Sequence, residues 1–268
     1  MKVKYYYQYS IDIDIETDKY VEVFIDTFSL SIPKGIRIII IEEPKRSALF
    51  DLIQKHQNCY TYVLTYHEEI LNTNPKAILF HCPNTWIKDY LFPKKEFSIS
   101  TVVGGKSDPT MAGYDLRHEL WRNKERIRIP KKFYLSGDSF HSHKFIKWKE
   151  ADYSNNLTLG SSKEPLFYSM FHICIENTSI KNYFSEKIID CFQTLTVPIY
   201  YGCTNIHEFF NIKGMFLARN IENLIDISNT LTPEIYYSML PVLKENFERS
   251  NEWTNAADKI RSTIIKLI

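Results

Sequence analysis

The chain alternates between short apolar runs and segments whose apolar residues recur at helical spacing. The run at 38–41 is apolar on both faces, which is typical of a central parallel strand covered by helices. The segment 185–195 places Ile188, Ile189 and Phe192 on one helical face. The pattern predicts strands within 1–30, at 38–41, 60–65, 77–80, 98–103, 171–175, 197–201 and 214–217, with 77–80 as a buried strand. It predicts helices at 47–56, 68–71, 113–123, 185–195, 221–230, 234–247 and 251–268. Residues 131–134 are expected to lead to a turn at 137–138, and residues 150–165 to form a loop. Alternating strands and helices predict an α/β protein with parallel sheets.

Two such layers follow one another along the chain. A charged segment with one proline, residues 88–97, separates them. A length of 268 residues suits two small α/β domains. We therefore expect an N-terminal domain over 1–95 and a C-terminal domain over 96–268, with the closing helix as a candidate to pack back on the first domain.

Charge and cysteine content narrow the class of protein. The formal net charge is +1, which offers no bulk attraction to nucleic acid or to an anionic membrane. The five cysteines are scattered without metal-ligand spacing, which favours a reducing compartment. His141 and His143 have no third ligand nearby, so we interpret them as surface residues and predict no metal site. The N-terminus lacks a signal-peptide core, and no window approaches the length of a membrane span. A soluble, cytoplasmic protein that binds no nucleic acid is the expectation.

The stretch 171–210 reads as a strand, a polar loop, a helix and a second strand. Ligands of parallel sheets bind at the carboxyl ends of strands, beside helix N-termini, and the polar loop falls at that place. Lys187 lies in the first helical turn, where the helix dipole disfavours a cation, so a bound anion such as phosphate would explain it. Glu186 could then accept hydrogen bonds from a ribose, while Asn177 and Tyr183 offer an amide and an aromatic face. Ordinary helix capping, with Ser185 as the N-cap and Glu186 as dipole partner, explains the same residues, and the residues alone leave both interpretations open.

Other candidates follow two further strands. Glu42 and Glu43 end the apolar run 38–41, where they either carry chemistry or simply face solvent in the turn. Gly104 and Lys106 follow the strand at 98–103, where a glycine permits close backbone approach and a lysine could meet a phosphate. Arg117, early in the next helix, could reach the carboxyl edge of the sheet, although most helix arginines are solvated.

The stretch IENTSIKNYFSEKIIDCFQTLTVPIYYGCTNIHEFF closely resembles the donor-binding motif of the α-1,3/4-fucosyltransferases, glycosyltransferase family 10. That motif reads approximately EN, a short gap, Y-[FV]-T-E-K, an apolar helix and [TV]-[IV]-P-[IV]-Y-[WY]-G. Weaker similarity extends over three further stretches. IIIIEEPKRS resembles the strand that ends in the family's catalytic base, and YVLTYHEEILNTNPKAILFHCPNTWI resembles the acceptor-domain pattern of its soluble bacterial and viral members. TVVGGK followed by GYDLRHELW resembles the segment that carries its phosphate-binding arginine. Ser185 stands where the family has threonine, and Thr204 where proline is common.

The resemblance implies a GT-B fold, in which two Rossmann-like domains face each other across a cleft that holds the active site. It implies inverting transfer of L-fucose from GDP-fucose to a glycan hydroxyl, with no cofactor and no metal. Carried over by position, Glu43 would be the base, with Glu42 as its rival, and Arg117 and Lys187 would bind the diphosphate. Glu186 would hold the ribose. The remaining candidates, Glu176, Asn177, Tyr183, Gly104 and Lys106, would line the donor site.

Two alternatives stay open beside this reading. The motif predicts a nucleotide diphosphate more specifically than it predicts the sugar, so another nucleotide sugar is one alternative. A sugar-nucleotide-binding protein without catalysis is the other, and it gains weight if neither glutamate reaches the site.

Overall fold

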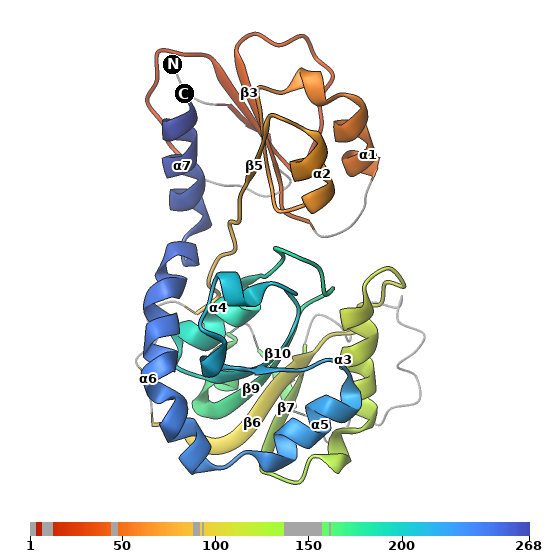
Figure 1. Cartoon of the computed structure of the whole chain (residues 1–268), viewed down its shortest axis with the longest axis vertical. Helices are drawn as coiled ribbons and strands as arrows, with labels where there is room; N and C mark the ends of the chain where they lie inside the picture. The colour runs from red at the N-terminus through yellow and green to blue at the C-terminus, as the bar shows by residue number, and fades with distance from the viewer. Residues whose placement is uncertain are drawn as a thin grey trace. The chain divides into compact units, whose positions relative to one another are not determined.

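The structure, a computed structural model, describes residues 4–6, 13–43, 48–87, 92, 94–136, 157–160 and 162–268. These residues form two compact units (Figure 1). The N-terminal unit combines Met1–Asn84 with Lys181–Tyr183 and Glu252–Ile268, and the C-terminal unit combines Thr85–Ile180 with Phe184–Asn251. The first crossing between units therefore follows Asn84, eleven residues before the boundary expected from the charged segment, and the last helix belongs to the N-terminal unit.

The N-terminal unit is built on a five-stranded parallel sheet in the order β1-β2-β3-β4-β5. Its strands are β1 (Lys4–Tyr6), β2 (Val21–Ile25), β3 (Ile36–Ile41), β4 (Tyr62–Thr65) and β5 (Ala77–Leu79). Its helices are α1 (Ala48–Lys55), α2 (Glu68–Thr73) and α7 (Ala256–Leu267). Ile260 and Ile264 of α7 are fully buried against one face of the sheet, and Phe50 of α1 packs on the other face. Burial on both faces explains why 38–41 is apolar throughout.

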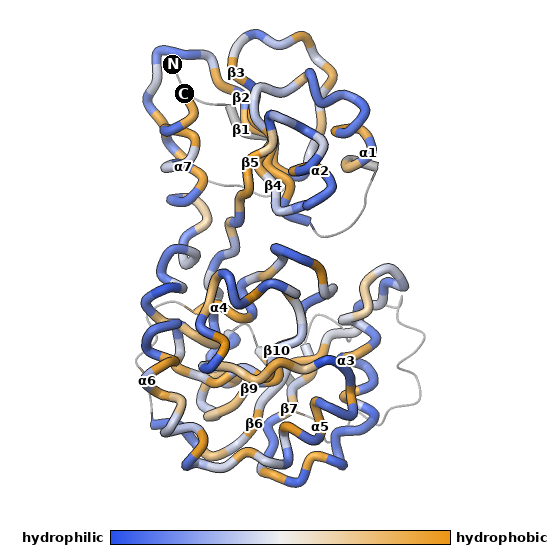
Figure 2. Tube along the Cα trace, viewed as in Figure 1, coloured by the Kyte–Doolittle hydropathy of each residue, from blue (hydrophilic) through white to orange (hydrophobic). Residues whose placement is uncertain are grey.

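The C-terminal unit is built on a six-stranded parallel sheet in the order β11-β10-β9-β6-β7-β8. Its strands are β6 (Glu96–Val103), β7 (Lys131–Ser136), β8 (Leu157–Leu159), β9 (Ser169–Ile175), β10 (Val197–Tyr201) and β11 (Phe216–Leu217). Its helices are α3 (Ala112–Arg122), α4 (Glu186–Gln193), α5 (Ile221–Thr230) and α6 (Pro233–Ser250). Residues of α3, α5 and α6 share one apolar core with alternate residues of β9 and β10. Figure 2 shows polar and apolar residues alternating along α5 and α6, as expected for helices that pack one face on a sheet.

The structure differs from the predicted elements at three strands. β5 is an edge strand, with Leu79 48% exposed, rather than a buried one. β7 lies where the sequence suggested an approach to a turn, because basic residues hide its alternating Phe133 and Leu135. β8 occupies part of the segment 150–165 that was expected to be a loop.

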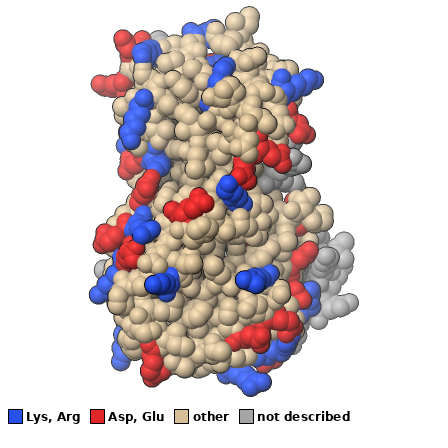
Figure 3. Space-filling model, viewed as in Figure 1, with Lys and Arg blue, Asp and Glu red and all other residues tan. Residues whose placement is uncertain are grey.

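The described residues contain no membrane-spanning helix, and the face drawn in Figure 3 has no charge field of a single sign. No described helix is both long enough and apolar enough to cross a membrane. On the face shown in Figure 3, basic and acidic side chains are interspersed. Any anion site must therefore come from a local arrangement of side chains.

Candidate functional site

The C-terminal sheet has a topological switch point between β6 and β9. From β6 the chain adds β7 and β8 on one side, then returns to place β9 beside β6 and adds β10 and β11 on the other side. Ligands of doubly wound sheets bind outside the carboxyl ends of the strands at such a point. Gly104 and Lys106 follow β6, and Glu176 and Asn177 follow β9, so these four predicted residues flank the switch point.

Glu176 organises the start of α4. Its side chain is completely buried, and its carboxylate accepts hydrogen bonds from the Ser185 amide (2.8 Å) and the Ser185 hydroxyl (2.7 Å). Lys187 Nζ lies 3.5 Å from the same carboxylate. Ser185 is the N-cap of α4, as the capping interpretation predicted, and its Oγ accepts from the Lys187 amide. A buried carboxylate needs such partners, so the first turn of α4 is held in one conformation.

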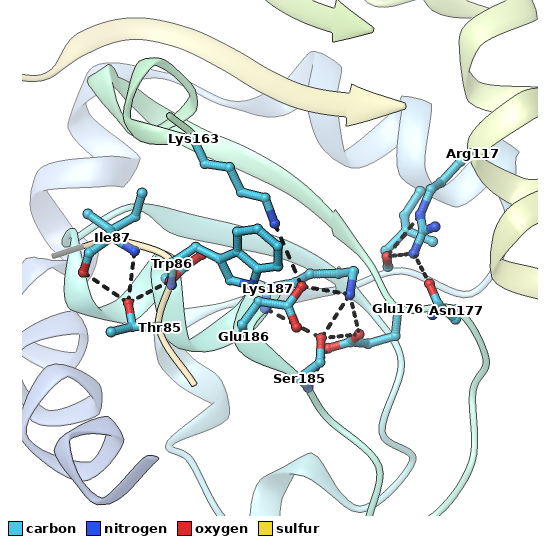
Figure 4. Close-up of polar contacts among 12 residues, drawn as sticks. Thr85, Trp86, Ile87, Arg117, Lys163, Glu176, Asn177, Ser185, Glu186 and Lys187 are labelled. Atoms are coloured by element: carbon cyan, nitrogen blue, oxygen red, sulfur yellow. Dashed lines mark hydrogen bonds and ion pairs between the residues drawn. The ribbon is translucent and has the colours of Figure 1, made fainter. Parts of the chain in front are cut away.

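Arg117 lies on the opposite side of the same chain segment. Its guanidinium donates to the carbonyl oxygen of Ile175 (3.1 Å from Nε) and to Asn177 Oδ1 (2.8 Å). Arg117 thus contacts residues 175 and 177, while Lys187 contacts residue 176 between them (Figure 4). The structure therefore brings the two predicted diphosphate ligands to the same three residues, 175–177, at the carboxyl end of β9.

A third cation, Lys163, joins this arrangement and was not predicted. Its Nζ lies 3.8 Å from Glu186 Oε1 and 3.6 Å from the ring centre of Trp86, a 60% exposed indole (Figure 4). Burial by itself raises the pKa of Glu186, but the Lys187 and Lys163 ammonium groups outweigh it and lower that pKa to about 2. Burial lowers the pKa of Lys163, against the attraction of Glu186. We call Lys163, Glu176, Ser185, Glu186 and Lys187 the α4 cluster.

Asp190, one turn further along α4, fixes the segment that carries Trp86. Its Oδ1 accepts from the Thr85 hydroxyl (2.7 Å) and from the Trp86 amide (2.9 Å). Burial raises the pKa of Asp190 to about 6, although these two hydrogen bonds oppose the rise. No sequence signal connects Thr85, Trp86 and Lys163 with α4, because only the packing of the C-terminal unit brings them together.

Two glycines allow this close packing. A Cβ at Gly113 would lie 1.8 Å from the carbonyl oxygen of Glu176, because the Gly113 amide donates to the Asn177 carbonyl at 2.9 Å. A Cβ at Gly202 would lie 2.5 Å from the Glu176 side chain. Both glycines permit close approach to the site segment, which a sequence reading of either one alone does not reveal.

Gly113→Ala is expected to lower the free energy of unfolding by about 2 kcal/mol, because the new methyl group meets backbone that cannot move aside. This cost exceeds the roughly 1 kcal/mol that alanine gains over glycine in a helix. Urea denaturation measures the change. Gly160→Ala is the matched control, since nothing lies within 4 Å of its added Cβ. Equal stability of the two variants would show that α3 can shift away from Glu176.

The candidate bases lie in the N-terminal unit, directly after β3. Glu43 is exposed, whereas Glu42 is half-buried and accepts a hydrogen bond from the Cys82 thiol. Burial raises the pKa of Glu42 to about 7, with smaller contributions from the neighbouring charges of Asp26 and Glu43. A carboxylate with a pKa near neutrality suits general-base catalysis, and an exposed one is accessible to an acceptor. Glu42 has the first property and Glu43 has the second, so both remain candidates.

The other predicted residues lie as follows. Tyr183 is buried in the N-terminal unit, with its ring centre 5.3 Å from that of Tyr66. The Gly104 carbonyl is 3.3 Å from His118 Nε2, and Lys106 is exposed in the loop after β6. Their roles in donor binding stay predictions. His141 and His143 lie outside the described residues. Among the residues that are described, no group of three or more His, Cys, Asp or Glu side chains could hold a metal ion.

The fold defines the class first. Two parallel sheets with covering helices are the GT-B architecture of glycosyltransferases, which confirms the predicted fold class. Sucrose-phosphate synthase from Thermosynechococcus elongatus matches with a TM-score of 0.60 and 11% identity, over 92% of this chain and 74% of that one. An α1,3-fucosyltransferase solved with GDP matches with a TM-score of 0.51 and 18% identity, over 92% of this chain and 77% of that one. At these identities the likeness concerns the fold alone.

Sequence comparison points to one particular relative. The chain is 29% identical over 138 residues to the α-(1,3)-fucosyltransferase FucT of Helicobacter pylori. The match covers 50% of this chain and 27% of that protein, so the chain spans about a quarter of the relative's length. No family model matches the chain. The predicted resemblance to the α-1,3-fucosyltransferases is confirmed, and the chain is similar to them in both sequence and fold.

Proposed function

We propose that this protein is an inverting glycosyltransferase that transfers L-fucose from GDP-fucose to a hydroxyl group of a glycan, without a metal ion. The observation that carries the proposal is the gathering of Arg117, Lys163 and Lys187 around residues 175–177 and the first turn of α4. Three cations and the positive end of a helix dipole suit a diphosphate. The sequence similarity to a fucosyltransferase supports fucose as the sugar.

In the proposed reaction, the carboxylate of Glu43 accepts the proton of the acceptor hydroxyl. The acceptor oxygen attacks the anomeric carbon from the face opposite the diphosphate, and the bond from that carbon to the diphosphate oxygen breaks. The configuration at the anomeric carbon is therefore inverted. Arg117 and Lys187 stabilise the negative charge that develops on the departing GDP, and Lys163 adds to their field.

Cationic side chains can perform the electrostatic task that a divalent metal performs in other nucleotide-sugar enzymes. Arginine binds phosphate oxygens with two parallel hydrogen bonds, and lysine supplies a compact positive charge. Glu176 sets the position of Lys187, because its buried carboxylate lies 3.5 Å from the Lys187 ammonium group. We propose that Glu186 turns to the ribose hydroxyls when the diphosphate replaces it as the partner of Lys187.

Calorimetry with GDP, UDP and their sugars tests the donor assignment. We expect GDP and GDP-fucose to bind at least tenfold more tightly than UDP and UDP-sugars, and fucose to appear on an acceptor in a glycan screen. Equal binding of GDP-fucose and UDP-sugars would contradict the fucosyl assignment. Tight GDP binding without transfer to any acceptor in the screen would instead favour a binding protein without catalysis.

A further inference from the structure

The backbone of Glu42 and Glu43 is held by side chains at all four of its polar groups. Asp26 Oδ1 accepts from the Glu42 amide (2.9 Å) and from the Glu43 amide (3.3 Å). The Tyr66 hydroxyl donates to the Glu42 carbonyl at 2.9 Å, and His67 Nε2 lies 3.0 Å from the Glu43 carbonyl. Because a carbonyl oxygen only accepts, His67 carries its proton on Nε2 in this contact.

These three side chains come from the strands on either side of β3. Asp26 directly follows β2, and Tyr66 and His67 directly follow β4. The ladder between β2 and β3 ends where the Asp26 amide donates to the Ile40 carbonyl at 3.0 Å. Asp26 then adopts a left-handed conformation, with φ of 46°, which turns the chain away from the sheet. The Asp26 carboxylate thus accepts the Glu42 and Glu43 amides in place of the β2 backbone, which has left the sheet.

Packing fixes the holding side chains in turn. The Tyr66 and His67 rings stack at 4.5 Å, and the Phe50 ring meets His67 edge-on at 5.3 Å. Tyr66 is 5% exposed. Burial raises the pKa of Asp26 to about 6, although the Glu42 and Glu43 amides oppose that rise. Glu42 is half-buried and Glu43 is exposed, so water could satisfy their backbone groups. Four side-chain hydrogen bonds therefore fix this dipeptide more tightly than polar satisfaction alone requires.

We infer that Asp26, Tyr66 and His67 are positioning residues, which fix the backbone that carries the catalytic base. The inference rests on the proposed function and applies equally if Glu42 or Glu43 is the base, because both share the Asp26 oxygen. A base must lie within hydrogen-bond reach of the acceptor hydroxyl, and displacement by about 1 Å can cost about 100-fold in rate. Rigid backbone support therefore sets the rate without touching substrate.

Asp26→Gly and Asp26→Asn test the inference in the intact chain. Glycine and asparagine both tolerate the left-handed conformation, but only asparagine keeps an oxygen that accepts the two amides. We expect Asp26→Gly to lower kcat of GDP-fucose transfer about 10- to 100-fold, with the dissociation constant for GDP within twofold of wild type. Asp26→Asn should recover most of the loss. Tyr66→Phe, which removes one hydrogen bond but keeps the ring, should lower kcat several-fold.

Amide hydrogen exchange provides a readout that does not need activity. Exchange at Glu42 and Glu43 should accelerate at least tenfold in Asp26→Gly and stay near wild type in Asp26→Asn. Wild-type kcat in Asp26→Gly, or an equal loss in Asp26→Asn, would overturn the positioning role. If Asp26→Gly does not fold, a wild-type kcat in Tyr66→Phe would overturn it. If the variants show the expected exchange rates but the wild-type protein transfers no sugar, the proposed function is contradicted and the support of the Glu42–Glu43 backbone is not.

Discussion

Glu43→Gln is expected to abolish sugar transfer, lowering kcat by about 10²- to 10⁴-fold, the usual contribution of a positioned general base. Glutamine has the same shape as glutamate but cannot accept the acceptor's proton at neutral pH. The side chain is exposed and lies outside the C-terminal unit that carries the α4 cluster, so the dissociation constant for GDP should be unchanged. Initial rates with GDP-fucose and calorimetry with GDP measure the two quantities separately.

Glu42→Gln is the matched variant one residue earlier. If Glu43 is the base, this variant keeps most of the activity. If Glu42 is the base, Glu42→Gln loses the activity and Glu43→Gln keeps most of it. In that case kcat/KM of the wild type falls about tenfold per pH unit below pH 7, because a base works only when deprotonated and the pKa of Glu42 is about 7. Full activity in both variants would end the assignment of the base to this dipeptide.

The second large effect is expected from the cations around residues 175–177. Arg117→Ala and Lys187→Ala should each weaken GDP binding by about 1.5–3 kcal/mol, roughly 10- to 160-fold, which is the range for hydrogen bonds to charged groups. Both side chains lie at the switch point of the C-terminal sheet, so their loss would remove the proposed contacts to the diphosphate directly. Calorimetry at two salt concentrations would register both the lost affinity and its electrostatic part.

Arg122→Ala is the control for the change in net charge, since Arg122 is exposed in the last turn of the same helix as Arg117. It should leave GDP affinity within twofold of wild type. Lys163→Met removes the third cation and keeps an aliphatic chain beside Trp86. It should weaken GDP binding less than Lys187→Ala does, because the Lys163 ammonium lies 3.8 Å from Glu186, whereas the Lys187 ammonium lies 3.1 Å from Glu186 and 3.5 Å from the buried Glu176. An unchanged affinity in Arg117→Ala or Lys187→Ala would remove that residue from the diphosphate site.

Much of the fold was predictable because burial leaves a regular trace in the sequence. The run 38–41 is apolar on both faces because α7 and α1 pack on opposite sides of β3. The periodic segment around Ile188 and Phe192 forms α4, and the C-terminal end of this helix lies within two residues of the predicted end. β7 was missed because lysines in its first half dilute the alternation, and β8 because its three residues are too few to show a period.

The candidate site was predictable only where its residues lie close together in the sequence. Glu176, Asn177, Glu186 and Lys187 belong to one strand–loop–helix unit, so their meeting follows from local structure. Lys163, Trp86 and Asp26 were missed, because a lysine, a tryptophan or an aspartate in a loop has many possible environments. Tyr183 was assigned to the same loop, yet residues 181–183 pack with the N-terminal unit, which no local pattern indicates.

The sequence by itself determined the alternation of strands and helices and the stretch that begins at Phe171, because periodicity, helix caps and a dense motif are local properties. The GT-B class came from the resemblance of that motif to a known family. Only the tertiary structure decided which distant groups meet. It placed Arg117 and Lys187 on either side of residues 175–177, and it placed side chains from two neighbouring strands on the backbone of Glu42 and Glu43. The physical reason is that strand order, fixed by the packing of whole layers, selects which strand ends become neighbours.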